Sequence, residues 1–434
     1  MTGTAAKIKH TGSSNEAGSP CYRCQEQKSA AGRAPVRIRI AVFFDGTLNN
    51  RTNTGLGEKG INRGVSYENA LTNVAILELY YQQNPEYDHS LSIYIEGIGT
   101  EDDEADSSIT AGTGWGSTGI LDKVETGMTK VIGEISKHLK RDQEIECLHL
   151  DCFGFSRGAA AARNFIYSVL FGQQNTLKLR LQSSTHYVGE IKVKFVGLYD
   201  TVASYGLNHR NDTEELHLDA IRYAENVVQL AAAEEHRKHF PLTNINSAPH
   251  GVQLFLPGAH SDIGGGYPDN MDEVDHQIMF VCRRHGLKAA DKAALARERE
   301  WLLASGWYYE DEIQKVDQWD EVKVTRKGIS NHFHRIPLKM MAELATENGV
   351  HFSAGLMSDF SIHHHLKEIE AFIRESPLDS PEYWLALNTD MIKKFRHDHL
   401  HFSACFGSTL GCNQPQFTDD DIVHGHRKRE IIYG

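Results

Sequence analysis

The sequence predicts an α/β fold with a mostly parallel central sheet, flanking helices and a largely helical C-terminal cap or packing region. Between residue 36 and Tyr267, short apolar runs rich in β-branched and aromatic residues alternate with amphipathic helical patterns. Such alternation is typical of a parallel sheet with helices on both faces. Helical periodicity dominates after Tyr267, and we expect few strands there. With 434 residues, the chain is long enough to bury a large core.

The expected strands are short runs that end in glycine or turn residues. They are VRIRIAVFF (36–44), LSIYIEGIG (91–99), IECLHLDCFGFS (145–156), IKVKFVGLYDT (191–201) and GVQLFLPG (251–258). Helical patterns lie between most of them, at 67–81, 119–140 and 157–171. Further helical patterns follow at 336–349, 362–375 and 381–395.

Two regions follow from this pattern, a short arm and one large domain. Residues 1–34 are rich in Ser, Gly, Ala and Lys and nearly free of aliphatic residues, which predicts a flexible N-terminal arm. The arm contains Cys21-x-x-Cys24, but without a second pair this motif favours a solvated tail over a zinc or redox site. Residues 35–434 are expected to form one catalytic domain with helical insertions, mostly helical from about 268 to 400.

Composition excludes several classes of protein. The net charge is −13, from 45 Lys and Arg against 58 Asp and Glu, so attraction to nucleic acid or to anionic lipid is not expected. The chain has seven cysteines, a small and odd number that argues against a disulfide framework. The sequence contains no uncharged apolar run of about 18 residues, so no membrane span is expected. The N-terminus lacks the apolar segment of a Sec signal peptide. The chain is therefore expected in the cytoplasm of the cell that makes it.

The strongest local motif is Gly154-Phe155-Ser156-Arg157-Gly158, a GxSxG sequence between an apolar strand and an alanine-rich helix. A nucleophile elbow needs small residues two before and two after its serine, because the tight turn brings backbone and helix too close for a β-carbon. The motif therefore predicts that Ser156 is a catalytic nucleophile at the end of a strand. The alternative is a glycine turn with an incidental serine.

A base and an orienting acid are expected later in the chain, in the order Ser, acid, His. Asp200 follows the strand KFVGLY, and His260 lies in the glycine-rich segment PGAHSDIGGGY after another strand. Asp262 is expected to support this segment. Structural roles, as a turn aspartate and a hydrogen-bonded histidine, remain the alternatives for Asp200 and His260. His401 in LHFSACFGS is the rival general base.

The oxyanion hole needs one backbone donor from the residue after the nucleophile and one from a loop after an earlier strand. Arg157 supplies the first. Gly46 or Thr47, after the strand that ends in VFF, is expected to supply the second, with Asp45 holding the loop by hydrogen bonds. FFDGTL also resembles the DxDGT motif of aspartate-nucleophile phosphatases, but Phe43 occupies the position of their nucleophile.

Metal chemistry is a weaker prediction. The chain has 24 histidines, but no HExxH motif. Candidate metal ligands are His332, His334, His363 to His365, His397, His399 and His401. The alternation in HDHLH suits a strand face, and serine chemistry needs no cofactor. The GTGWGSTG stretch (112–119) has no phosphate-binding fingerprint and predicts a flexible loop or a lid.

Five segments that occur together in this order resemble one α/β-hydrolase family. The family was once known only as a domain of unknown function, and it includes the phospholipase effectors of bacterial type VI secretion. The segments are FFDGTLNN (43–50), GFSRGAAAAR (154–163), VGLYDTVAS (196–204), PGAHSDIGGGY (257–267) and IPLKMM (336–341). The LHFSA and RKREIIYG segments also look like the end of such effectors.

This resemblance implies a phospholipase A that cleaves glycerophospholipids without a cofactor, with Ser156 as nucleophile, Asp200 as acid and His260 as base. It also implies a cognate immunity protein, a secretion-system spike or adaptor as delivery partner, and secretion into the periplasm of a target bacterium. Two other classes remain open: a metal-dependent hydrolase that uses the histidine-rich C-terminal half, and a non-catalytic hydrolase-fold interaction module.

Overall fold

The computed structural model describes residues 34–113, 116, 118–140, 143–172, 175–184, 186–205, 210–280, 289–314, 321–405, 415 and 429–434. The expected N-terminal arm, apart from residue 34, and the motif Cys21-x-x-Cys24 lie outside these residues. In the described part, no helix is both long enough and apolar enough to cross a membrane.

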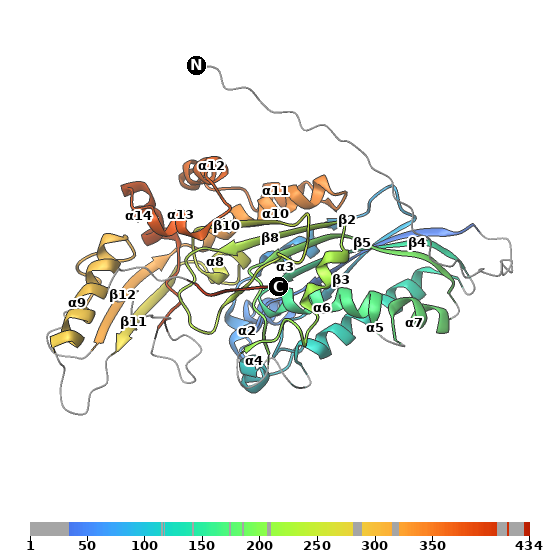
Figure 1. Cartoon of the computed structure of the whole chain (residues 1–434), viewed down its shortest axis with the longest axis horizontal. Coiled ribbons are helices and arrows are strands. Elements are labelled where there is room, and N and C mark those ends of the chain that lie inside the picture. Colours follow the sequence, from blue (N-terminus) through green and yellow to red (C-terminus); the bar gives the residue numbers. More distant parts are fainter. Residues whose placement is uncertain are drawn as a thin grey trace, which may run out of the picture.

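A six-stranded sheet forms the centre of the molecule, and every neighbouring pair of its strands is parallel (Figure 1). The strand order is β10-β8-β5-β4-β1-β3. The bounds are β1 (Val36–Phe44), β3 (His89–Ile95), β4 (Ile145–Phe155), β5 (Val188–Tyr199), β8 (Asn226–Ala232) and β10 (Val252–Leu256). Five of these strands confirm the sequence prediction. β8 was not predicted, because NVVQLAA is short and Gln229 interrupts its apolar run.

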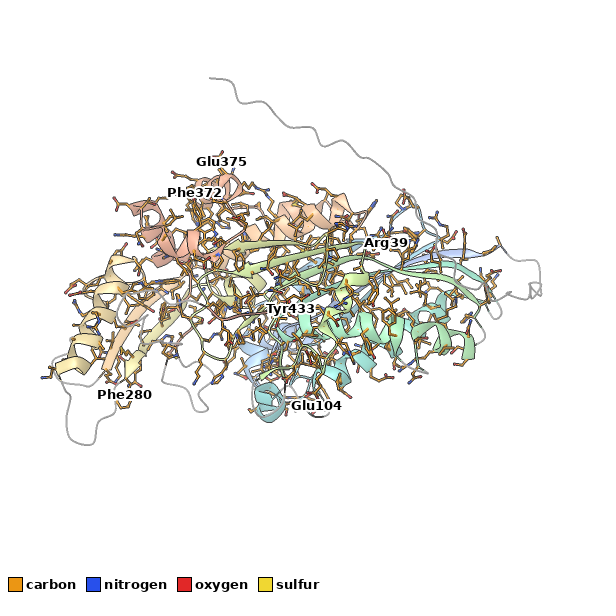
Figure 2. All side chains as sticks on the ribbon, viewed as in Figure 1. Arg39, Glu104, Phe280, Phe372, Glu375 and Tyr433 are labelled. Carbon is orange, nitrogen blue, oxygen red and sulfur yellow. The ribbon has the colours of Figure 1, made fainter. Side chains whose placement is uncertain are left out.

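Each face of the sheet packs against its own layer of helices, since alternate side chains of a strand point to opposite faces. Ile38, Ile40 and Val42 of β1 join the core with α5 (Ile120–His138) and α6 (Arg157–Phe171). Four consecutive buried alanines, at residues 159–162, let α6 approach the sheet closely. The other face packs against α3 (Asn73–Leu79), α8 (His260–Gly264) and α10 (Arg335–Glu347). Side chains fill the space on both sides of the sheet (Figure 2).

The mostly helical region after Tyr267 also contains two longer strands that the sequence analysis did not predict. β11 (Met271–Phe280) and β12 (Glu321–Ile329) form an antiparallel pair beside α9 (Ala289–Ala304). Three register shifts interrupt this pairing, so β11 lacks the strict alternation by which a strand is recognised. The helical part of the prediction holds for the remainder of this region. It contains α10, α11 (Gly355–Asp359), α12 (Lys367–Glu375), α13 (Pro381–Ala386) and α14 (Asp390–His399).

Two local predictions also need correction. The helical pattern at 67–81 splits into α2 (Val65–Glu68) and α3, with the Thr72 hydroxyl capping α3 at the amide of Ala75. The expected loop at 112–119 is corrected only at its start, where residues 112 and 113 belong to α4 (Ser108–Thr113). Residues 116, 118 and 119 lie in no helix or strand, and residues 114, 115 and 117 lie outside the described part. The remaining short elements of the described residues are α1 (Arg51–Gly57), α7 (Leu177–Ser183), β2 (Tyr81–Gln82), β6 (Ser204–Tyr205), β7 (Arg210–Asn211), η1 (Leu218–Tyr223), β9 (Leu242–Thr243), η3 (Asn331–His334), β13 (His351–Phe352), η4 (His364–Leu366) and β14 (Ile431–Ile432).

Candidate active site

The candidate residues follow the carboxyl ends of strands that are parallel neighbours. Asp45 follows β1, Ser156 follows β4 and Asp200 follows β5. His260 begins α8, which follows β10, an outer strand of the sheet. In a parallel sheet the carboxyl ends of all strands lie on the same side, where α/β proteins place their sites.

Ser156 has the backbone of a strained turn between β4 and α6. Its φ is 60° and its ψ is −128°, values that a residue with a β-carbon rarely adopts. A β-carbon on Gly154 would lie 2.5 Å from the Cα of Ala159, and one on Gly158 would lie 2.2 Å from the carbonyl oxygen of Asp45. The two glycines are therefore required by close backbone contacts, as in a nucleophile elbow.

Contacts around Ser156 bring Asp200 and His260 to the same place. The Ser156 amide donates to the Tyr199 carbonyl at 3.0 Å, so the residue before Asp200 is tied to the elbow. His260 Nδ1 lies 2.5 Å from Asp200 Oδ2, and both side chains are buried. The His260 ring packs on Phe155, with 4.6 Å between ring centroids. The structure thus assembles the predicted serine, acid and histidine segments.

Asp200 has a second partner that the sequence analysis missed. Arg429 holds it with two hydrogen bonds, Nη1 to Oδ1 at 2.6 Å and Nη2 to Oδ2 at 2.8 Å, and both side chains are buried. Arg429 is 229 residues away in sequence, so no local pattern indicated the contact. The only signal was its position in RKREIIYG, one of the two tail segments that resemble effectors.

The C-terminal segment is fixed in place around this contact. β14 (Ile431–Ile432) pairs in parallel with β9 (Leu242–Thr243). Arg429 Nε donates to the Phe240 carbonyl at 2.8 Å, and the Gly434 amide donates to Asn244 at 3.0 Å. In the view of Figure 2, Tyr433 projects over the middle of the molecule rather than at either end. These contacts hold Arg429 against Asp200.

These contacts set the charge states of the pair. Burial alone would raise the pKa of Asp200, but the Arg429 charge and the His260 hydrogen bond outweigh it and hold that pKa well below its usual range. Burial lowers the pKa of His260 from 6.5, while Asp200 partly opposes that shift. At neutral pH His260 is therefore a neutral imidazole beside a carboxylate. Its Nδ1–H is assigned as the donor to Asp200, which leaves Nε2 as the basic nitrogen.

Two buried glutamates at the end of β8 hold the loop before His260, and sequence analysis missed both. The Gly258 amide donates to Glu234 at 2.9 Å, and the His260 amide donates to Glu235 at 3.1 Å. Each carboxylate is itself paired with an arginine, Glu234 with Arg396 and Glu235 with Arg237. The histidine backbone is thus fixed by paired charges rather than by glycine flexibility alone.

The rival base His401 belongs to a second histidine–carboxylate pair. Its Nδ1 lies 2.7 Å from Asp262 Oδ1, and its amide donates to Asp262 Oδ2 at 3.1 Å. Asp262 also accepts from the Ala259 amide at 2.9 Å, so it supports the start of α8 as expected. The His401 ring is buried and stacks on Tyr267. It makes no hydrogen bond to Ser156 or Asp200 within the described residues.

The structure of the loop after β1 bears on whether Gly46 or Thr47 supplies the second oxyanion donor. Asp45 accepts from the Gly46 amide at 2.7 Å, from Thr72 at 2.6 Å and from Tyr94 at 2.5 Å, which confirms that it holds the loop. Burial raises the pKa of Asp45 to about 6, although these donors oppose the shift. Because the Gly46 amide is already used, Gly46 does not suit the oxyanion role. No described residue accepts from the Thr47 amide, and the buried Thr47 hydroxyl also lacks a partner there.

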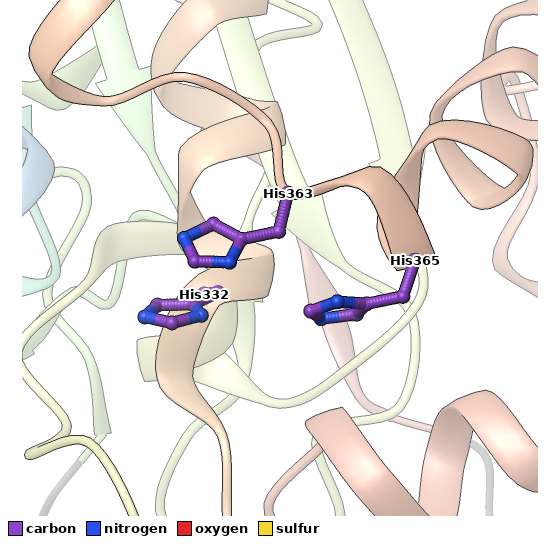
Figure 3. A group of neighbouring side chains, drawn as sticks. All are labelled: His332, His363 and His365. Atoms are coloured by element: carbon purple, nitrogen blue, oxygen red, sulfur yellow. The ribbon is translucent and has the colours of Figure 1, made fainter.

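Most of the candidate metal ligands are dispersed. His334 Nδ1 bonds Asn73, and His397, in α14 rather than on a strand face, bonds Asp398 and Glu312. In the described part, the one group of three histidines, cysteines or carboxylates that could hold a metal ion is His332, His363 and His365 (Figure 3). No hydrogen bond joins these three imidazoles to the Ser156, Asp200 and His260 group.

Comparison with known proteins found a matching family model and similar solved structures. Residues 172–291, which include Asp200 and His260, match the family model described as "T6SS, Phospholipase effector Tle1-like, catalytic domain". The fold is similar to that in a solved structure of the Tle1 effector bound to the VgrG spike of the type VI secretion system. In that comparison the TM-score is 0.60 and the identity 21%, over 92% of this chain and 94% of that one.

A second solved structure, an uncharacterized protein from Pseudomonas aeruginosa, aligns with a TM-score of 0.42 and 18% identity, over 80% of this chain and 52% of that one. No curated protein matches the chain. The resemblance found in the sequence is nevertheless confirmed: residues 172–291 carry the pattern of the Tle1-like catalytic domain, and the chain shares the fold of a type VI secretion effector.

Proposed function

We propose that the protein is a serine ester hydrolase, a phospholipase A of the type VI secretion effector class that acts through an acyl-enzyme. The observation that carries the proposal is the strained backbone of Ser156 beside the buried Asp200–His260 pair. The match of residues 172–291 to a phospholipase effector catalytic domain supports the substrate class.

In the proposed reaction, Ser156 Oγ attacks the ester carbonyl carbon while His260 Nε2 takes the hydroxyl proton. The tetrahedral intermediate collapses when His260 returns that proton to the leaving alcohol, which breaks the ester bond and leaves the acyl group on Ser156. Water then attacks the acyl-enzyme with His260 again as base, and the fatty acid leaves. Asp200 holds His260 in the required tautomer throughout, and Arg429 holds Asp200.

The oxyanion of the intermediate needs two donors near the elbow. We assign the amide of Arg157, at the first position of α6, and that of Thr47. Gly158 supports this assignment because it lets the Asp45 carbonyl approach α6, which brings the loop of Thr47 against the helix. The Thr47 hydroxyl is a candidate third donor.

The activity is tested with a phospholipid that carries different acyl chains at its two positions. Wild-type protein should release one fatty acid and the matching lysophospholipid, and Ser156→Ala should release neither above background. EDTA should leave the wild-type rate unchanged, because the proposed steps use no metal. Release of a phosphorylated headgroup instead of a fatty acid would exclude a phospholipase A, and loss of the activity with EDTA would favour metal-dependent hydrolysis.

Delivery by a type VI secretion spike follows from the similarity to the Tle1 effector, whose structure was solved with the VgrG spike. In this proposal the protein acts on glycerophospholipid in the periplasm of the target bacterium, and the producing cell protects itself with an immunity protein. Expression with a periplasmic signal should inhibit growth, whereas Ser156→Ala should not. Equal growth inhibition by both would separate toxicity from ester hydrolysis.

A further inference from the structure

Three imidazoles from two separate segments converge at one point outside the proposed active site. His332 belongs to η3 (Asn331–His334), and His363 and His365 lie at η4 (His364–Leu366). One ring nitrogen of each lies within 4.8 Å of those of the other two (Figure 3). From this geometry we propose that His332, His363 and His365 bind one transition-metal ion such as Zn²⁺.

The donor set suits such an ion. Imidazole nitrogen is a preferred ligand of zinc, copper and nickel, and three protein ligands leave a fourth position open. Zinc–nitrogen bonds of about 2.1 Å place tetrahedral ligands about 3.4 Å apart, so the rings need to close by little more than 1 Å. His365 is exposed and His332 and His363 are partly exposed, so side-chain rotation can supply this movement.

Ring packing favours neutral imidazoles, which is the form that binds metal. The rings of His332 and His363 are stacked, with centroids 4.0 Å apart and planes 25° apart. Two cationic rings in this arrangement would repel each other strongly. His365 is stacked in turn on His399 of α14, with centroids 5.0 Å apart. The stacks hold the rings close together, and metal binding requires them to rotate so that one nitrogen of each ring points at the ion.

The surrounding charges are mixed. Asp269 Oδ2 lies 3.6 Å from His332 Nε2, so it adds negative charge beside the ion. The buried Nδ1 of His399 has no hydrogen-bond partner among the described residues, and the His399 ring is stacked on His365. Arg335 opposes the ion with its positive charge, but it donates to the Ser361 carbonyl at 3.1 Å. The carboxylate thus offsets the one nearby guanidinium in the described structure.

A bound ion would join the η3 and η4 segments, which are about thirty residues apart in sequence. Since metal binds the folded form, it should raise the melting temperature. It should leave ester hydrolysis unchanged, because none of the three histidines belongs to the proposed catalytic group. The site is therefore proposed as a structural link and does not depend on the proposed function.

The test is titration of tag-free, metal-free full-length protein with Zn²⁺ by calorimetry, and with Co²⁺ by absorption. We expect one ion per chain and a cobalt spectrum without a thiolate charge-transfer band. His363→Gln and His365→Gln should each weaken binding at least tenfold, because each removes one of three ligands. The matched control is His364→Gln, between them in sequence and outside the ligand group, which should bind as the wild type does.

Cys21 and Cys24 are a competing source of ligands, so Cys21→Ser/Cys24→Ser must bind zinc like the wild type. Loss of binding in that variant, or a thiolate band in the cobalt spectrum, would assign the metal to the CxxC motif and overturn the proposal. Wild-type affinity in the His363→Gln/His365→Gln double variant would also overturn it, as would absence of binding at micromolar zinc. A zinc-dependent rise in melting temperature that disappears in the double variant would support it.

Discussion

At the scale of single residues, His260 and His401 each have a buried carboxylate partner, and of these two only His260 packs on the elbow. His260 bonds Asp200 and packs on Phe155, whereas His401 bonds Asp262 and stacks on Tyr267. Sequence order favours His260, because it follows a sheet strand whereas His401 follows the helix α14. Packing supports the same choice.

The choice between the two bases is tested by substitution. His260→Ala should lower kcat by a factor on the order of 10³ or more, and adding Ser156→Ala should cost little further, because members of a catalytic group act as a unit. His401→Ala should retain substantial turnover after correction for its folded fraction. A well-folded His260→Ala with wild-type turnover, together with an inactive His401→Ala, would transfer the role of base to His401.

Arg429 should affect the pH dependence as well as the stability. His260 must be neutral to accept the serine proton, so activity is lost as pH falls through its pKa, and the lowered pKa places that loss below pH 6.5. Arg429→Met removes a positive charge beside Asp200, so the carboxylate should raise the pKa of His260 and move the acidic limb of kcat/KM to higher pH.

Removing one partner of the buried Arg429–Asp200 pair should also cost about 3 kcal/mol of stability or more. Arg429→Lys is the second variant, because it keeps the charge and loses the two-pronged hydrogen bond. It should retain more of the wild-type pH profile than Arg429→Met does. If Arg429 has a purely structural role, the variants should give less active protein, but the acidic limb of kcat/KM should stay at its wild-type pH.

At the scale of elements, the turn between β4 and α6 depends on how closely the helix approaches the sheet. Gly158→Val places side-chain atoms against the Asp45 carbonyl, so folded yield, melting temperature and activity should all fall. Gly133→Val in α5 is the matched control, because a β-carbon there meets no atom within 4 Å. It should carry only the helix-propensity effect of a surface substitution. A Gly158→Val protein as stable as the control would show that the turn is not tightly packed.

Elements with a strong local pattern were predictable from the sequence. The sequence predicted five such elements because each is a sustained apolar run or an amphipathic helix: β1, β4, β5, α5 and α6. β11 was not predicted, because its bulged pairing hides the alternation, and β8 was not, because it is short and contains Gln229. In the candidate site, motif and order predicted Ser156, Asp200 and His260, and the structure brings their segments together. Arg429, Glu234 and Glu235 were not predicted, because tertiary contacts alone bring them there.

At the scale of the whole molecule, the sheet carries the candidate site at one edge, and the helices α10–α14 cover one face (Figure 1). An enzyme for bilayer lipid must accept long acyl chains from an aggregated substrate. We therefore expect much higher turnover on dispersed phospholipid than on a short soluble acetate ester, measured per active site. Equal turnover on the two would remove the interfacial part of the proposal and leave a general esterase.

The central claim is that Ser156 is a nucleophile activated by His260. The most direct measurement is the rate of labelling by a fluorophosphonate probe, with the modified residue identified by peptide mass spectrometry. We predict one label per chain on Ser156, with labelling slowed strongly in His260→Ala and absent in Ser156→Ala. An unlabelled but folded wild-type protein, or a label on another serine, would contradict the account.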